Sequence, residues 1–178
     1  TIPDNLKVLW SQLISTSNYW LHFFLYNDEA GYLAISTAKK RKTRAIIEAA
    51  MNVKASGTPV KVEIMVPLVG NHKELRYQKN IIDKTAEAVF AERNDRIDYL
   101  VGTMIEVPRA AVTANQIAEV AEFFSFGTND LTQMTLGFSR DDIAKFLPIY
   151  LERNILKNDP FKILDRNGVG QLIREAAL

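Results

Sequence analysis

The 178-residue chain contains no cysteine, which excludes disulfides, thiolate metal sites and a cysteine nucleophile within it. Proline and glycine are also scarce, with six and eight residues. Apolar residues make up 47% of the chain and charged residues 24%. This composition excludes collagen-like, low-complexity and disordered chains, and the length predicts one domain with a buried core.

An excess of charge of one sign is lacking as well. The chain has 22 Lys and Arg against 21 Asp and Glu, so its formal net charge is +1. We therefore expect neither nucleic acid nor an anionic membrane surface as its main partner. The basic run Lys39–Lys42 has two interpretations, a nucleic-acid or localisation patch and a solvated turn or helix end. The neutral charge balance favours the second.

No uninterrupted hydrophobic run is long enough to cross a membrane. The most apolar stretch, Leu9–Tyr26, contains seven polar positions: Ser11, Gln12, Ser15, Thr16, Ser17, Asn18 and His22. The sequence begins Thr-Ile-Pro-Asp and lacks the basic start and clean apolar centre of a signal peptide. These features predict an intracellular chain, and we expect a cytoplasmic location.

Aromatic residues are concentrated at the beginning. Seven of the 17 lie in the first 42 positions, namely Trp10, Tyr19, Trp20, Phe23, Phe24, Tyr26 and Tyr32. Regular apolar periodicity follows the basic run, so we place a boundary near Thr43. This divides the chain into an aromatic-rich segment, 1–42, and an α/β region, 43–178. The aromatic side chains are interpreted either as core or as a partner-binding surface.

Helical and strand periodicities alternate after Arg44. Apolar spacing predicts a helix that Gly57 and Pro59 end, and further helices follow the first two strands. Strands are predicted over Val60–Val69, Tyr99–Val107 and Phe123–Phe126, and the chain beyond Ser139 is predicted to be mainly helical. This order is typical of parallel α/β folds. Three strands are too few for a complete eight-stranded barrel, which needs about 250 residues.

Polar residues follow the second and third predicted strands. Glu106 lies at the end of one, and the turn Gly127-Thr128-Asn129-Asp130 follows the other. Because the carboxyl ends of neighbouring parallel strands meet at one edge, the two carboxylates are expected side by side. They suit Mg²⁺, and the backbone N–H groups of 127–130 suit an anion. The alternative is that Glu106 pairs with Arg109 while Asp130 caps a turn.

Three stretches carry a resemblance to a known family. The string GTMIEVPRAAVTANQIAEVAEFFSFGTNDLTQMTLGFSRDD, residues 102–142, closely resembles the phosphoenolpyruvate-binding barrel of the PEP-utilising enzymes. Residues 145–173 are similar to the pyruvate, phosphate dikinase branch rather than to phosphoenolpyruvate synthase or enzyme I, and residues 62–78 fit the same family. The resemblance covers about three quarters of the chain, roughly 44–178. It implies an incomplete (β/α)8 TIM-type barrel.

The resemblance also implies roles for individual residues. Glu106 and Asp130 match the family's Mg²⁺ ligands, and Gly127, Thr128, Asn129 and Asp130 match the turn that binds phosphoenolpyruvate or pyruvate. In that family, Mg²⁺ chelates the carboxylate and enol oxygens of pyruvate enolate. A phosphohistidine from another domain delivers the phosphoryl group. The family reaction interconverts ATP, pyruvate and phosphate with AMP, phosphoenolpyruvate and pyrophosphate.

Other parts of the family pattern have no counterpart here. The two substrate-clamping arginines, the proton-transferring cysteine, the phosphohistidine domain and the ATP-grasp domain are unmatched. We therefore expect no complete catalytic set and no turnover by these residues alone, and we expect self-association as a homodimer. The alternatives are a non-catalytic interaction module, a degraded gene product, or a fragment of phosphoenolpyruvate synthase or enzyme I.

Overall fold

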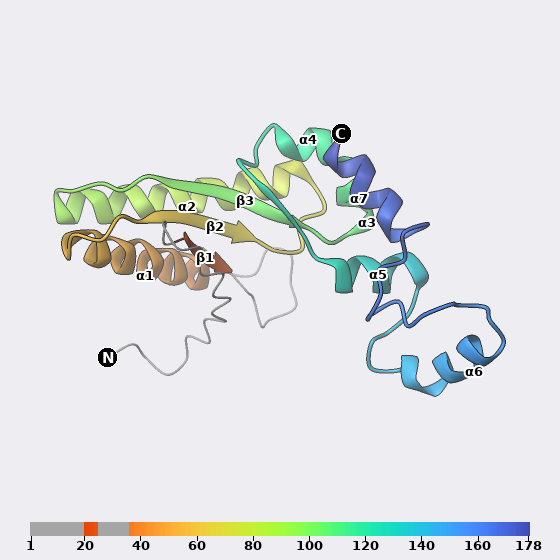
Figure 1. Ribbon diagram of the computed structural model, residues 1–178. Coiled ribbons are helices and arrows are strands. Elements are labelled where there is room, and N and C mark those ends of the chain that lie inside the picture. Colours follow the sequence, from red (N-terminus) through yellow and green to blue (C-terminus); the bar gives the residue numbers. More distant parts are fainter. Residues whose placement is uncertain (1–19, 25–35) are drawn as a thin grey trace.

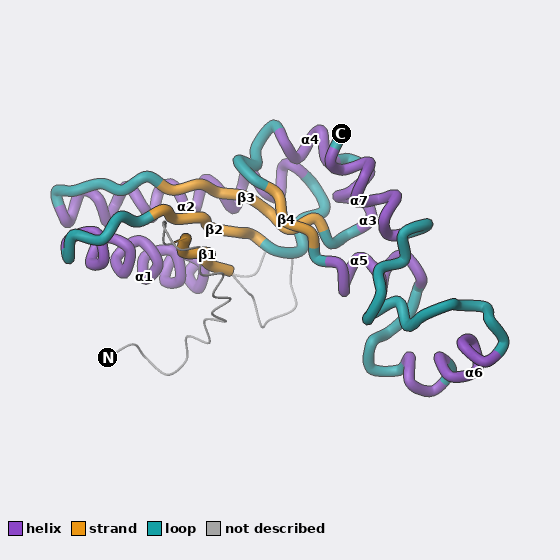
Figure 2. The backbone as a smooth tube through the Cα atoms, in the orientation of Figure 1, coloured by secondary structure: helices purple, strands orange, loops and turns teal. Residues whose placement is uncertain are grey.

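A four-stranded parallel sheet organises the chain. The computed structural model describes residues 20–24 and 36–178, and places the strands in the order β1-β2-β3-β4. The strands are β1 (Trp20–Phe24), β2 (Lys61–Val66), β3 (Tyr99–Ile105) and β4 (Phe124–Phe126). Figure 2 shows β2, β3 and β4 running side by side. Because each pair of neighbouring strands is parallel, the carboxyl ends of all four described strands lie at the same edge.

Helices connect these strands and extend the chain beyond them. They are α1 (Ser36–Ala55), α2 (His72–Arg93), α3 (Pro108–Val112), α4 (Ala114–Ala118), α5 (Thr128–Leu136), the 3-10 turn η1 (Ile143–Lys145), α6 (Leu147–Glu152) and α7 (Val169–Ala177). Helix α1 packs beside α2, and α7 packs against α3 and α4. In Figure 1 the long helices α1 and α2 run alongside the strands, while α6 lies far from the sheet. The described fold is therefore α/β.

The core lies between the sheet and its helices. Val62, Ile64 and Val66 alternate along β2 and are all buried in the core cluster, as are Val101 and Ile105 of β3. This spacing of two places one face of each strand against the helices. The helices supply complementary apolar residues, among them Ile47, Leu75, Ile82, Val89 and Ile117. The sheet therefore presents its intervening positions to the opposite face.

Local signals fix the ends of the long helices. The Asn71 side chain accepts a hydrogen bond from the backbone N–H of Lys73 at 2.9 Å, which caps the start of α2. Glu74 accepts from the backbone N–H of Gly70 at 3.1 Å. Gly57 follows α1 with a φ of 84°, a conformation that glycine adopts without a steric penalty. The predicted stop at Gly57 is confirmed.

The predicted β2, β3 and β4 strands are confirmed, each with narrower bounds. The expectation of three strands was wrong, because Trp20–Phe24 forms β1 and pairs in parallel with β2. A short apolar run of this kind cannot be assigned to a strand or a helix by periodicity. The rest of the aromatic-rich segment up to residue 35 lies outside the described residues.

Two further expectations differ from the structure. The position chosen as a boundary, Thr43, lies inside α1, which also contains the basic run Lys39–Lys42. The prediction of a mainly helical chain beyond Ser139 was wrong, since residues 153–168 form turns and irregular structure. The backbone N–H groups of Lys162 and Ile163 both bond to the Asp159 carbonyl there, so the chain turns locally instead of extending a helix.

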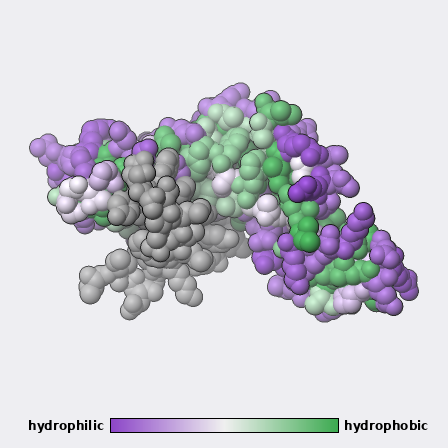
Figure 3. Space-filling model, viewed as in Figure 1, coloured by the Kyte–Doolittle hydropathy of each residue, from purple (hydrophilic) through white to green (hydrophobic). Residues whose placement is uncertain are grey.

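The C-terminal region keeps several apolar side chains exposed. They include Met134, Ile149, Ile155 and Ile163. Figure 3 shows hydrophobic surface interspersed with hydrophilic surface over this part of the molecule. Within the described ranges, no helix combines the length and apolarity needed to span a bilayer.

Truncating Ile47 should test the α1–α2 core. The Ile47 side chain is 0% exposed, so Ile47→Ala is expected to lower the free energy of unfolding by about 3 kcal/mol through lost burial and a new cavity. Val53→Ala, at a position 36% exposed in the same helix, should cost less than about 1 kcal/mol. Urea unfolding followed by circular dichroism measures both, and equal losses would contradict this description of the core.

Candidate functional site

A buried carboxylate lies directly after β3. Glu106 is only 3% exposed, and its Oε1 accepts a hydrogen bond of 2.6 Å from the backbone N–H of Leu68. Leu68 lies in the loop between β2 and α2 and has a φ of 57°. This left-handed conformation is unfavourable for a residue with a side chain. The loop therefore holds a strained backbone at the point where it contacts Glu106.

Gly127 packs directly against the same carboxylate. A Cβ at this position would lie 2.6 Å from Glu106 Oε2 and 2.7 Å from Met104 Sδ. Both separations are too short for any side chain to fit without displacing its neighbours. The Gly127 N–H donates to the Ile105 carbonyl at 3.1 Å. That N–H is therefore already hydrogen-bonded and is not available to an anion. Of the backbone N–H groups expected to bind an anion, those of residues 128–130 remain.

Residues 128–130 begin a helix. The prediction that they form a turn was wrong, because α5 spans Thr128–Leu136 with Gly127 as its N-cap. Gly, Thr, Asn and Asp are common both in turns and at helix starts, so their composition does not separate the two. The N–H groups of Thr128, Asn129 and Asp130 open the first turn of α5, where they have no acceptor within the helix. This end of the helix attracts negative charge.

Glu106 and Asp130 interact electrostatically. Burial raises the pKa of Glu106 to about 7, while the Leu68 hydrogen bond acts in the opposite direction. The nearby Asp130 carboxyl contributes a smaller part of the same upward shift in pKa. The structure thus brings the two predicted carboxylates together at the carboxyl edge of β3 and β4.

No basic side chain of the described residues forms an ion pair with either carboxylate. The alternative that Glu106 pairs with Arg109 was wrong, because the Arg109 guanidinium donates to the carbonyl of Gly70. Among the residues that the structure describes, no group of three or more His, Cys, Asp and Glu side chains could hold a metal. The site therefore offers two carboxylates, a donor set that suits a hard divalent ion keeping several water ligands.

Sequence reasoning missed two groups that contact these carboxylates. One is the backbone N–H of Leu68, which no side-chain pattern marks. The other is Gln133, whose Nε2 donates to Asp130 Oδ1 at 3.0 Å. Gln133 lies three residues after Asp130, so a correct helix start at Thr128 would have placed both side chains on one face.

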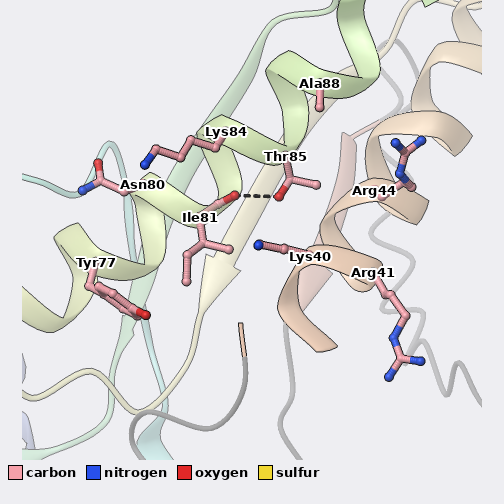
Figure 4. A pocket seen from close by; sticks show the side chains of 9 residues that line it. All are labelled: Lys40, Arg41, Arg44, Tyr77, Asn80, Ile81, Lys84, Thr85 and Ala88. Atoms are coloured by element: carbon pink, nitrogen blue, oxygen red, sulfur yellow. Dashed lines mark hydrogen bonds between the residues drawn. The ribbon is translucent and has the colours of Figure 1, made fainter. Parts of the chain in front are cut away.

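Two hollows lie outside the carboxylate pair. One of about 240 Å³ is lined by Thr128, Asn129 and Thr132 of α5 and by Pro160, Phe161, Lys162 and Leu164. Another, of about 720 Å³, lies between α1 and α2 and is lined by Lys40, Arg41, Arg44, Tyr77, Asn80, Ile81, Lys84, Thr85 and Ala88. Figure 4 shows Lys40 extending toward α2 and Arg41 pointing away from it. The first hollow shares Thr128 and Asn129 with the predicted site, whereas the second contains no predicted site residue.

Comparison with known proteins identifies relatives for most of the chain. Residues 31–178 match the family model of the PEP-utilising enzyme, PEP-binding domain. Pyruvate, phosphate dikinase 1, chloroplastic, of Arabidopsis thaliana is 60% identical over 135 residues, and the enzymes of Mesembryanthemum crystallinum and Oryza sativa are each 58% identical. Each alignment covers 76% of this chain and 14% of the relative. The chain belongs to the PEP-utilising enzyme family, in which it corresponds to part of the PEP-binding domain of pyruvate, phosphate dikinases.

Proposed function

We propose that this chain forms the Mg²⁺- and phosphoenolpyruvate-binding edge of a pyruvate, phosphate dikinase, and that its parallel sheet is part of a TIM-type barrel. The observation that carries the proposal is that the start of α5 packs against the buried Glu106 carboxyl at Gly127 and brings Asp130 close enough to raise the pKa of Glu106. The two carboxylates lie where two parallel strands end, and neither has a basic side-chain partner among the described residues. Family membership supplies the substrate class, phosphoenolpyruvate or pyruvate.

The donor set fits a magnesium ion. A carboxylate that is 3% exposed and has no cationic partner in the described part of the chain is costly to keep charged, and a divalent ion would offset that cost. Two carboxylate ligands leave further positions for water and for substrate oxygens. Glu106 and Asp130 would hold the ion, which when bound supplies Lewis-acid stabilisation of negative charge on substrate oxygens.

The other site residues would orient the substrate. Thr128 and Asn129 present backbone N–H groups and an amide at the start of α5, where an anionic carboxylate or phosphate is stabilised. Gly127 allows α5 to begin in contact with Glu106. The Leu68 hydrogen bond holds Glu106 in place before any ligand arrives. These groups are held on strand ends and a helix start, which favours preorganisation of the site.

Binding without turnover is the activity that we propose for these 178 residues alone. The family reaction interconverts ATP, pyruvate and phosphate with AMP, phosphoenolpyruvate and pyrophosphate through a phosphohistidine. The residues present have no counterpart of the family's clamping arginines or proton-transferring cysteine. Losing charge stabilisation and proton transfer costs factors of about 10² or more each.

The names of the relatives bear on the cellular compartment of this chain. Three of the similar dikinases are described as chloroplastic, which favours a plastid over the cytoplasmic location expected from the sequence. We propose the chloroplast as the compartment and a homodimer as the assembly. The absence of nucleic-acid and membrane partners stays a prediction from the charge balance.

Thermal unfolding with ligands tests the proposed function. Mg²⁺ and phosphoenolpyruvate added together should raise the midpoint by several degrees, because ligands that bind only the folded chain stabilise it. Glu106→Gln should remove most of this shift, since it deletes one of two charged ligands. Glu119→Gln, at an exposed position on the surface, is the matched control and should keep the shift. A wild-type midpoint indifferent to both ligands would refute the proposal.

Adding a methyl group at Gly127 should disturb the site directly. Gly127→Ala would place a Cβ 2.6 Å from the Glu106 carboxylate, so the carboxylate must move and Mg²⁺ affinity should fall about tenfold or more. Gly70→Ala is the matched control, because a Cβ there has no atom within 4 Å. Isothermal titration with Mg²⁺ and phosphoenolpyruvate measures both variants. Equal affinities in the two would contradict the packing of Gly127 against Glu106.

The raised pKa of Glu106 predicts a pH dependence of stability. Between the ordinary value of 4.5 and about 7, the folded chain binds more protons at Glu106 than the unfolded chain does. The contribution of Glu106 to the free energy of unfolding should therefore fall as pH rises through this window. The difference between wild type and Glu106→Gln, measured by urea unfolding at pH 5 and pH 8 in chelator, isolates this contribution. A difference that stays constant or rises with pH would contradict the prediction.

A further inference from the structure

The Asp130 carboxylate has one oxygen already engaged. Gln133 lies three residues further along α5, and its Nε2 donates to Asp130 Oδ1 at 3.0 Å. A carboxylate alone turns readily about its terminal torsion, because that torsion has broad minima. A hydrogen bond to one oxygen selects one orientation and directs the other oxygen elsewhere.

Two further hydrogen bonds hold Gln133 in place. Its Oε1 accepts from the backbone N–H of Arg140 at 2.8 Å, and its carbonyl accepts from the N–H of Phe138 at 2.9 Å. Gly137 permits this close return, with a φ of 66° at the end of α5. Because the amide oxygen faces a donor and the amide nitrogen faces an acceptor, only one orientation of the amide satisfies both bonds. The side chain is thus fixed between the 137–140 turn and Asp130.

Arg140, whose backbone N–H bonds to Gln133, also contacts an aromatic ring. The Arg140 guanidinium lies over the Phe161 ring, 5.7 Å from its centroid. Phe161 belongs to a turn in which its N–H bonds to Asp159 Oδ1 at 2.9 Å. The connection therefore runs from Asp130 through Gln133 to residues about 30 positions further along the chain.

We propose that Gln133 is a positioning residue that orients Asp130 for a divalent cation. This inference rests on the proposed function and extends it to a residue outside the predicted ligand set. A neutral amide suits the task, because it orients a carboxylate without cancelling its charge. A lysine or arginine in the same place would neutralise Asp130 and repel the cation. Loss of a group that orients a metal ligand typically weakens metal binding by 10–100-fold.

Gln133→Met tests the positioning role, since it keeps the length of the side chain and removes both hydrogen bonds. The probe is Mn²⁺ alone, with the free ion followed by electron paramagnetic resonance. We expect Mn²⁺ binding about tenfold weaker than in the wild type. Gln171→Met, on the exposed surface of α7, is the matched control and should bind as the wild type does. Equal Mn²⁺ affinity in Gln133→Met and wild type would overturn the proposal.

A double-mutant cycle distinguishes positioning from a general structural role. If Gln133 acts through Asp130, Gln133→Met should cause no further loss of Mn²⁺ affinity in an Asp130→Asn background. A tenfold loss in both backgrounds would mean that Gln133 acts by another route, and would overturn the proposal.

A readout without metal separates this inference from the proposed function. In the metal-free chain, the Gln133 side-chain amide should exchange slowly with solvent by ¹H–¹⁵N NMR, and Asp130→Ala should abolish that protection. A protected amide in a wild-type chain that binds no Mn²⁺ would refute the metal site while supporting the orientation of Asp130. An unprotected amide would overturn the inference even if Mn²⁺ binds.

Discussion

Burial of the Glu106 carboxylate is the constraint around which the site is arranged. A charge in a position 3% exposed is tolerated only where hydrogen bonds or counter-charges compensate for lost hydration. Within the described ranges the compensation is small, one backbone N–H from Leu68, and the nearby Asp130 increases the cost. Stored electrostatic cost of this kind is typical of functional sites, because a ligand of opposite charge can relieve it.

Parallel strand pairing creates that constraint. Because β2, β3 and β4 run in one direction and in chain order, their following segments meet at one edge of the sheet. The segment after β2 contributes Leu68, β3 is followed by Glu106, and β4 leads into α5 with Gly127 at its start. Three segments about 20 to 40 residues apart thus converge on one carboxylate. This convergence is the reason that parallel sheets bind ligands at their carboxyl ends.

Aromatic contacts stabilise the segment that follows α5. Phe138 lies against Phe146 and Tyr150, with ring centroids 4.9 Å and 6.0 Å away. These contacts support the turn that carries Arg140, whose backbone N–H holds Gln133. Aromatic packing remote from the carboxylates is therefore linked, through Arg140 and Gln133, to the orientation of Asp130. Side-chain contacts of this range explain how residues without any ligand-binding chemistry contribute to a site.

Sequence periodicity predicted β2, β3 and β4, because each is an apolar run bounded by turn residues. It failed for β1, which lies in an aromatic stretch without clear alternation, and for α5, whose first residues favour turns and helix starts equally. The proximity of Glu106 and Asp130 was predicted from residue type and from the strand period of 24 positions, and the structure brings the two together. Leu68 and Gln133 were missed. A backbone N–H has no sequence signature, and Gln133 contacts Asp130 only because both residues lie in helix α5.

What the sequence by itself determined is the chemistry available. Without cysteine, and with carboxylates following two strands, the donors that the sequence predicts at this edge are carboxylate oxygens. The tertiary structure alone decided the surroundings of those carboxylates. It buried Glu106, directed Arg109 to Gly70 instead, and placed Gln133 between Asp130 and Arg140. The physical reason is that burial and these hydrogen-bond partners depend on groups up to 39 positions away, which packing brings together and no local pattern encodes.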